Sequence, residues 1–98
     1  MDIFSRFADF VAVSVHQLIE DGQVTPRQAV NTEKLTVELP REESHGDLAC
    51  NAAMVLAKQV SMAPRDLAGL LADKLVTHED ISTVDIARPG FLNITLKP

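Results

Sequence analysis

The sequence contains a single cysteine, Cys50, among its 98 residues. One cysteine excludes an intrachain disulfide framework and any zinc site built from several thiolates. We therefore interpret Cys50 as a small core residue. Long hydrophobic runs are also absent, since no stretch of roughly 18 apolar residues occurs. The first residues also lack the basic region, apolar stretch and small-residue cleavage site of a signal peptide. We expect a cytoplasmic chain that makes no membrane contact.

Positive charge is scarce and scattered along the chain. Nine Lys and Arg residues stand against 14 Asp and Glu residues, which gives a formal net charge of -5. Sequence-independent binding of nucleic acid normally derives most of its affinity from neutralised phosphates. Any nucleic-acid role of this chain must therefore be local and must be supported by other parts of a larger protein.

The residues that are present indicate one folded domain over residues 1–98. The composition is 46% hydrophobic and 23% charged, which is close to the globular average. A chain of this length has room for one hydrophobic core.

Three helices are predicted from apolar residues at helical spacing. The first covers residues 2–21 and begins at the cap residue Asp2. The second runs from residue 48 to about residue 59, and we expect Asp47 to cap it. The third begins near Pro64, a residue that suits the first turn of a helix.

Strands are predicted at residues 35–39, 83–87 and 91–96, and a fourth could lie between residues 22 and 34. The order of elements predicts an α+β fold with two layers, in which three to four mainly antiparallel strands carry helices on one face. The last two strands form an antiparallel hairpin, while the direction of the first strand stays open.

The closing hairpin holds the candidate binding residues. Alternation along the last strand turns Leu92 and Ile94 into the core and Phe91 and Asn93 to the opposite face. Pro89 and Gly90 favour a type II turn, with a positive φ at the glycine.

An aromatic ring beside an amide is a combination that proteins use to read unpaired RNA bases, by stacking and by hydrogen bonds to a base edge. Arg88 lies close enough in sequence to meet a phosphate. The residues alone equally allow Phe91 to pack under a neighbouring loop and Asn93 to satisfy backbone groups at the end of a strand.

Four segments together resemble the N-terminal additional domain of arginyl-tRNA synthetases in content, order and spacing. They are residues 39–40, 45–58, 63–68 and 87–93. The resemblance implies a domain that contacts the D-loop at the outer corner of tRNA, with Phe91 and Asn93 holding an exposed base. It also implies motif positions with structural roles at Gly46, Asp47, Asn51, Pro89 and Gly90.

The resemblance further implies that catalysis belongs elsewhere in a longer parent enzyme, an ATP-dependent arginine–tRNA ligase. The His-Ile-Gly-His-like block and the Lys-rich loop of the catalytic domain are absent from this sequence, so no catalytic residue is assigned here. ATP and magnesium are implied for the parent and no cofactor is expected in this chain. The sequence departs from the family at Arg88, where bacterial members often carry glycine.

Other functions are less well supported by the residues. His45 and Asp47 could ligate a metal, but no third ligand follows at a recognisable spacing, so no metal site is assigned. Ser44 beside His45 is too generic to indicate a hydrolase. Acidic side chains are interpreted as a solvated face that would oppose RNA; they are Glu38, Glu42, Glu43 and Asp85. A structural module that packs on its parent enzyme without RNA contact remains the second hypothesis.

Overall fold

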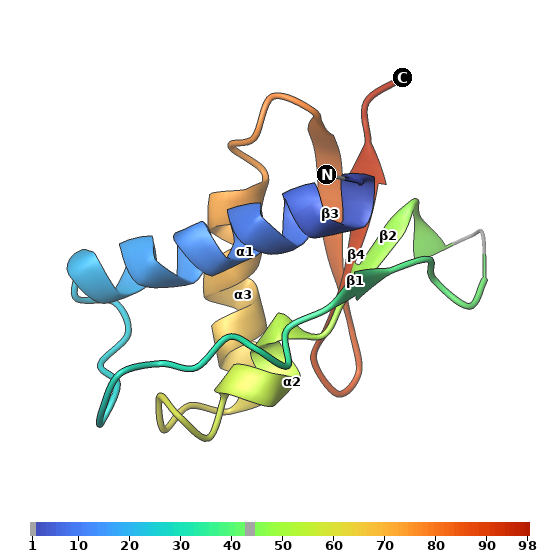
Figure 1. The fold of residues 1–98 in the computed structure, drawn as a ribbon. Coiled ribbons are helices and arrows are strands. Elements are labelled where there is room, and N and C mark those ends of the chain that lie inside the picture. The colour runs from blue at the N-terminus through green and yellow to red at the C-terminus, as the bar shows by residue number, and fades with distance from the viewer. Residues whose placement is uncertain (1, 43–44) are drawn as a thin grey trace.

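A four-stranded antiparallel sheet carries three helices on one face in the computed structural model, which describes residues 2–42 and 45–98 (Figure 1). In chain order the elements are α1 (Ile3–Glu20), β1 (Val37–Glu38), β2 (Leu48–Cys50), α2 (Ala52–Leu56), α3 (Pro64–Leu75), β3 (Ile81–Ala87) and β4 (Phe91–Leu96). The predicted α+β class, with its helices on one side of the sheet, is confirmed.

Helices α1 and α3 begin where local chemistry favours it. The Asp2 carboxylate accepts a hydrogen bond of 2.7 Å from the Ser5 amide and caps α1. This bond lowers the pKa of Asp2, because it stabilises the charged form. Pro64 occupies the first turn of α3, and Asp66 lies near the positive end of that helix.

The second helix begins later than predicted. Residues 48–50 form strand β2 in place of the first helical turn, and α2 comprises only Ala52–Leu56. Leu48 and Cys50 are buried on one face and Ala49 is half-buried on the other, which is the alternation of a strand. A three-residue run is too short for its period to be read, so an alanine-rich sequence looked helical.

The sheet order is β1-β2-β4-β3, and each neighbouring pair is antiparallel. The open direction of the first strand is thereby settled. That strand is shorter than the predicted 35–39, and residues 22–34 contain no strand, so β2 is the fourth strand. Strand β4 occupies the centre, with β2 and β3 on its two sides.

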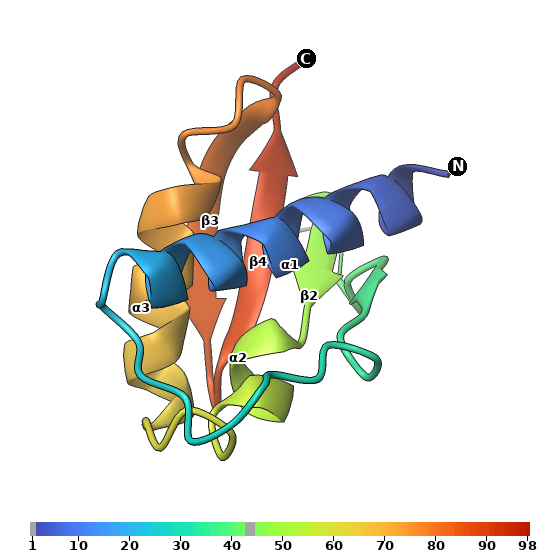
Figure 2. The same ribbon diagram turned by 60° about the vertical axis from the view of Figure 1, so that its left-hand side comes forward.

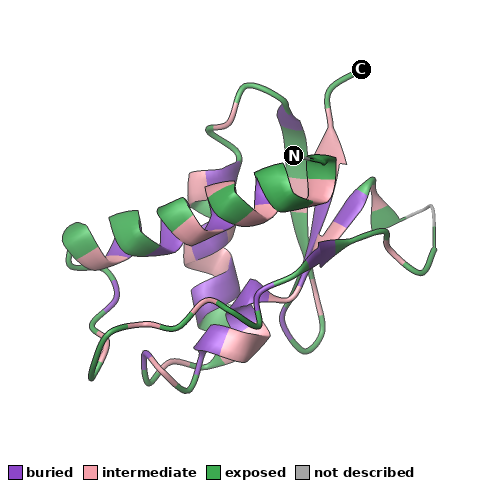
Figure 3. Ribbon diagram, in the orientation of Figure 1, coloured by how far each residue is buried: buried purple, intermediate pink, exposed green. Residues whose placement is uncertain are grey.

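The hydrophobic core lies between the sheet and the helices. Leu92 and Ile94 of the central strand are fully buried against Leu56, Leu67 and Leu71 of the helical layer. Buried segments concentrate on the facing sides of both layers (Figure 3). Figure 2 shows α1 crossing the strands on this side, and no helix of residues 2–42 and 45–98 covers the opposite face of the sheet.

Candidate nucleic-acid interface

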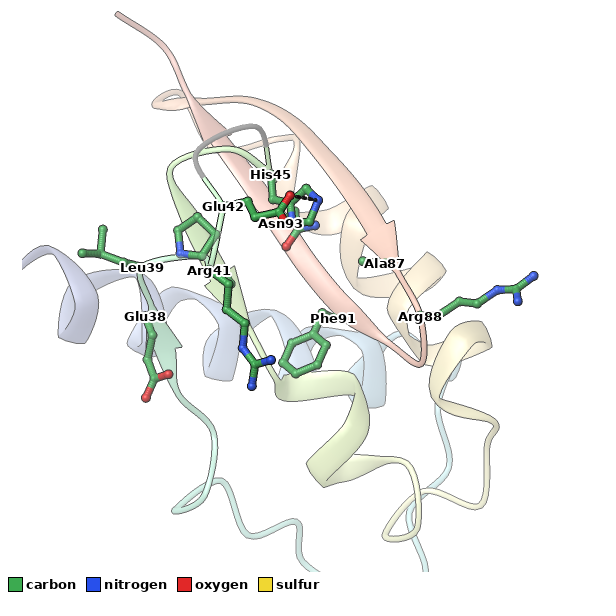
Figure 4. Close-up of a pocket in the computed structure, with 11 residues that line it drawn as sticks. Glu38, Leu39, Arg41, Glu42, His45, Ala87, Arg88, Phe91 and Asn93 are labelled. Atoms are coloured by element: carbon green, nitrogen blue, oxygen red, sulfur yellow. Dashed lines mark ion pairs between the residues drawn. The ribbon is translucent and has the colours of Figure 1, made fainter.

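A hollow of about 420 Å³ lies on the sheet face that the helices leave uncovered (Figure 4). Its walls come from strand β4, the end of β3, and the connection between β1 and β2. The lining residues are Glu38, Leu39, Pro40, Arg41, Glu42, His45, Ala49, Ala87, Arg88, Phe91 and Asn93. The hollow therefore brings together residues from three of the four segments named above, 39–40, 45–58 and 87–93.

Phe91 presents its ring at the edge of this hollow. It is the first residue of β4 and pairs with Ala87 of β3, while the next residue, Leu92, points into the core. Because side chains alternate along a strand, the burial of Leu92 holds Phe91 on the outer face. The residue is 37% exposed, so part of its ring is open to solvent.

Asn93 lies deeper in the same hollow. Its neighbours across the sheet are Ala49 on β2 and Asp85 on β3. It is 9% exposed, and the small side chain of Ala49 leaves its amide open to the hollow. Within the described part of the chain the Asn93 amide makes no hydrogen bond, and none of its atoms is both buried and unpaired. With respect to residues 2–42 and 45–98, its donors and its acceptor are therefore open to solvent or to a ligand.

The turn before Phe91 differs from the prediction. Strand pairing ends at Ala87 and Phe91, so the loop holds three residues, and the Arg88-Pro89 peptide bond is cis. Gly90 does not take a positive φ, so the predicted type II turn was wrong. The glycine serves close packing: a Cβ at Gly90 would lie 2.9 Å from the Cβ of Pro64.

Arg88 borders the hollow, but its guanidinium points away from the Phe91 ring (Figure 4). The side chain is exposed. An RNA contact by Arg88 would therefore lie outside the hollow.

Gly46 and Asp47 attach the β1–β2 connection to the central strand. Gly46 has a φ of +98°, and a Cβ there would lie 2.9 Å from the carbonyl oxygen of Ile94. The Asp47 amide donates to that same oxygen at 2.8 Å, and the Asp47 carboxylate accepts from the Leu96 amide at 2.8 Å. The predicted helix cap at Asp47 was wrong, because its carboxylate is paired with β4.

Asn51 connects the segment before β1 to the start of α2. Its side-chain oxygen accepts from the Thr36 amide at 2.7 Å, and its side-chain nitrogen donates to the Lys34 carbonyl at 3.1 Å. Both halves of this amide are engaged by backbone groups. Asn51 is thus a positioning residue for the polypeptide, in contrast to Asn93, whose amide is open.

Arg41, Glu42 and His45 were not predicted to approach Phe91. Figure 4 shows the Arg41 side chain extending toward the ring, and both residues line the hollow. His45 Nε2 lies 3.6 Å from Glu42 Oε2 on the exposed surface, an ion pair when the imidazole is protonated. A strand at residues 48–50 would have placed this connection beside β4, but three residues are too few to show a clear period.

The described residues offer little to other chemistry. Residues 2–42 and 45–98 contain no group of three or more His, Cys, Asp or Glu side chains arranged to hold a metal. No helix among them is long and apolar enough to cross a membrane. Glu43 and Ser44, considered above as part of an acidic face and as a nucleophile, lie outside the described residues.

Cys50 faces the core and is fully buried. Desolvation raises the pKa of its thiol to about 11, so the thiol is protonated and unreactive near neutral pH. This agrees with its interpretation as a core residue.

Comparisons with known proteins point to one family. The family model described as "Arginyl tRNA synthetase N terminal domain" matches residues 7–96. Three relatives described as arginine–tRNA ligase are similar over nearly the whole chain. The proteins from Jannaschia sp., Parvibaculum lavamentivorans and Azorhizobium caulinodans are 48%, 47% and 45% identical over 96, 98 and 96 residues, which is 98%, 100% and 98% of this chain.

The aligned region covers 16% of each of these relatives, so the chain spans about a sixth of their length. The family match and the identities both extend over the sheet, the helices and the hollow described above. The chain belongs to the arginyl-tRNA synthetase N-terminal domain family.

Proposed function

We propose that this domain contacts tRNA at the D-loop, on the outer corner of the molecule, and so aids the attachment of arginine by a longer parent enzyme. The observation that carries the proposal is the exposed Phe91 ring next to the unengaged Asn93 amide, in a hollow of about 420 Å³. The ring stacks on an unpaired base, and the amide bonds to the edge of that base.

The strength of such a contact is modest. Stacking of one base contributes roughly 1–3 kcal/mol, and one hydrogen bond adds about 0.5–1.5 kcal/mol. Acidic side chains around the hollow oppose the approach of RNA; they are Glu38, Glu42 and Asp85. The contact therefore acts on tRNA that other domains of the parent already hold, by effective concentration.

Arginylation itself is assigned to the parent enzyme, and a cytoplasmic location accompanies this proposal. ATP and magnesium would be bound there, because the described residues do not fit either group. The hollow is lined by one apolar ring, one amide and scattered charges, and no cluster of three metal-ligating side chains occurs in residues 2–42 and 45–98.

A second candidate is a module that packs on the parent protein and touches no RNA. Its support is a separate hollow of about 430 Å³ bordered by Ile3, Phe4, Leu39, Leu48 and Leu96. Leu39 is 72% exposed and Ile3 is 41% exposed, so this surface has apolar side chains that are not covered by the rest of the domain. Under this alternative, changes at Asn93 leave arginylation kinetics unchanged.

The deciding experiment is steady-state arginylation by the full-length protein with Phe91→Ala or Asn93→Ala. The substrates are wild-type tRNA and a tRNA altered in its D-loop. We expect Phe91→Ala to lower kcat/KM on wild-type tRNA by roughly 5- to 150-fold, the equivalent of one lost stacking contact. Asn93→Ala should lower it by about 2- to 12-fold, since one hydrogen bond is lost.

Both losses should vanish on the altered tRNA, because the base they act on is gone. Val13→Ala is the matched control, since Val13 is a 51% exposed apolar residue on α1. Helix α1 packs on the face of the sheet opposite to the hollow. Equal, small losses on both tRNAs would contradict the RNA contact and favour the packing module.

A further inference from the structure

Three connecting segments meet at one end of the molecule. They are the connection from α1 to β1, the connection from α2 to α3, and the β3–β4 loop, and they lie together in both ribbon views (Figures 1 and 2). The Gln59 side chain bonds both to the amide and to the carbonyl of Asn31, at 2.7 and 2.9 Å. Gly90 packs on Pro64 at the start of α3. The three segments therefore form one surface.

Charge is divided unequally between this end and the rest of the domain. The three connections, residues 21–36, 57–63 and 88–90, together with Arg65 and Asp66 at the start of α3, contain five Lys and Arg residues and three acidic residues, a net charge of +2. The remainder contains four Lys and Arg residues and eleven acidic residues, a net charge of -7. We call this surface the basic end; its cations are Arg27, Lys34, Lys58, Arg65 and Arg88.

The cations of the basic end are exposed and have no ion-pair partner among residues 2–42 and 45–98. Two cations elsewhere are neutralised, since Arg6 pairs with Asp80 at 2.6 Å and Lys74 with Asp21 at 2.7 Å. Free cations gathered on one surface of an acidic domain create a local positive potential that attracts an anionic partner.

The basic end adjoins the hollow that holds Phe91. Phe91 begins strand β4 directly after the loop, and the Arg88 guanidinium points away from the hollow (Figure 4). Arg65 follows Pro64, the residue on which Gly90 packs, and Lys58 precedes Gln59, which holds the neighbouring segment. Arg65 and Arg88 therefore lie within two residues of the contact between Pro64 and Gly90, directly before Phe91.

We propose that the basic end binds backbone phosphates of the RNA strand that flanks the base at Phe91, with Lys58 and Arg65 as phosphate contacts in addition to Arg88. The inference rests on the proposed function and extends it from one base to a strand. It also explains how a domain with a net charge of -5 meets RNA: the cations of the basic end supply a local positive charge that the net charge conceals.

The test is the salt dependence of tRNA binding by the full-length protein. The variant is Lys58→Gln combined with Arg65→Gln, compared over about 50–200 mM salt. Each phosphate contact contributes roughly 0.7–0.9 to the slope of log Kd against log salt concentration, so the double variant should lower that slope by about 1.4–1.8. Lys58→Arg combined with Arg65→Lys should retain the wild-type slope.

Lys97→Gln is the control for general charge, because Lys97 is exposed and follows β4 at the end opposite to Phe91. It should leave the slope unchanged. A wild-type slope for the double Gln variant, or the same decrease in Lys97→Gln, overturns the proposal and leaves the basic end to an acidic protein partner or to none.

The base contact at Phe91 and the phosphate contacts at the basic end can be tested independently. Phe91→Ala should reduce kcat/KM but retain the salt slope, since it removes no charge. An unchanged kcat/KM for Phe91→Ala together with a lowered slope for the double Gln variant would remove the base contact and support the phosphate surface. A reduced kcat/KM with an unchanged slope would do the reverse.

Discussion

Two asparagines illustrate how the same side chain takes opposite roles. The Asn51 amide accepts from the Thr36 amide and donates to the Lys34 carbonyl, so both its oxygen and its nitrogen are engaged. The Asn93 amide lies in the central strand, beside a hollow, without a hydrogen bond to any described residue. A polar group in an almost buried position normally finds a partner within the protein. The unengaged amide at Asn93 is therefore the residue-level feature that most favours a ligand.

A second residue-scale consequence concerns Cys50 and pH. Burial raises the pKa of its thiol from 9.0 to about 11. In the unfolded chain the thiol ionises first, so above pH 9 the unfolded state binds fewer protons than the folded state. The free energy of unfolding is therefore unaffected below pH 9 and falls between pH 9 and 11, by up to about 2–3 kcal/mol.

Urea denaturation of the wild-type chain and of Cys50→Ala across this range measures the effect. Lysine residues titrate in both proteins alike, so the difference between the two curves isolates the thiol. We expect the stability gap to shrink as the pH rises toward 11. Parallel pH profiles would show that the thiol ionises without a change in folding stability.

At the scale of elements, the sequence predicted the helices and strands that are long enough to repeat an apolar pattern. Helices α1 and α3 and the closing hairpin were predicted because each repeats its apolar pattern several times. Strand β2 was missed because three residues cannot show a period, and because its existence depends on pairing with β1 and β4. Phe91 and Asn93 were placed on the outer face correctly, whereas the approach of Arg41 and His45 followed from β2 and could not be seen.

Two glycines near α3 give a matched test of packing between elements. A Cβ at Gly90 would lie 2.9 Å from Pro64 and 3.3 Å from the Met54 side chain. We expect Gly90→Ala to destabilise the domain by about 1–3 kcal/mol, because the β3–β4 loop must move away from α3. Gly69 lies within α3 and has nothing within 4 Å of an added Cβ.

Gly69→Ala should accordingly stabilise the domain by about 0.5–1 kcal/mol, the gain from alanine in a helix. Thermal and urea unfolding of both variants check the pair. Destabilisation of similar size at both positions would mean that the loop does not rest on α3 as closely as described. Such a result would also weaken the continuity of the basic end.

For the whole molecule, the distribution of charge over the surface bears on RNA binding more directly than the net charge does. The composition alone argued against RNA binding, and it could not reveal that the connections carrying Arg27, Lys34, Lys58 and Arg88 meet at one end of the molecule (Figures 1 and 2). These connections are far apart in the sequence, and the fold brings them together. This part of the interface depends on long-range topology, so no local pattern predicts it.

The isolated domain should bind tRNA only weakly, because the contacts at Phe91 and Asn93 are few. Stacking and one hydrogen bond together hardly exceed the ~4 kcal/mol of a millimolar complex, and the acidic remainder of the chain opposes binding. Titration of the 98-residue chain with tRNA at about 150 mM salt, followed by NMR, should therefore show no saturation below about 1 mM. Small shifts should still appear at the amides of Phe91 and Asn93 and should be absent in Phe91→Ala. Saturable micromolar binding by the isolated chain would show that the domain needs no help from its parent, and would contradict an interface that works by effective concentration.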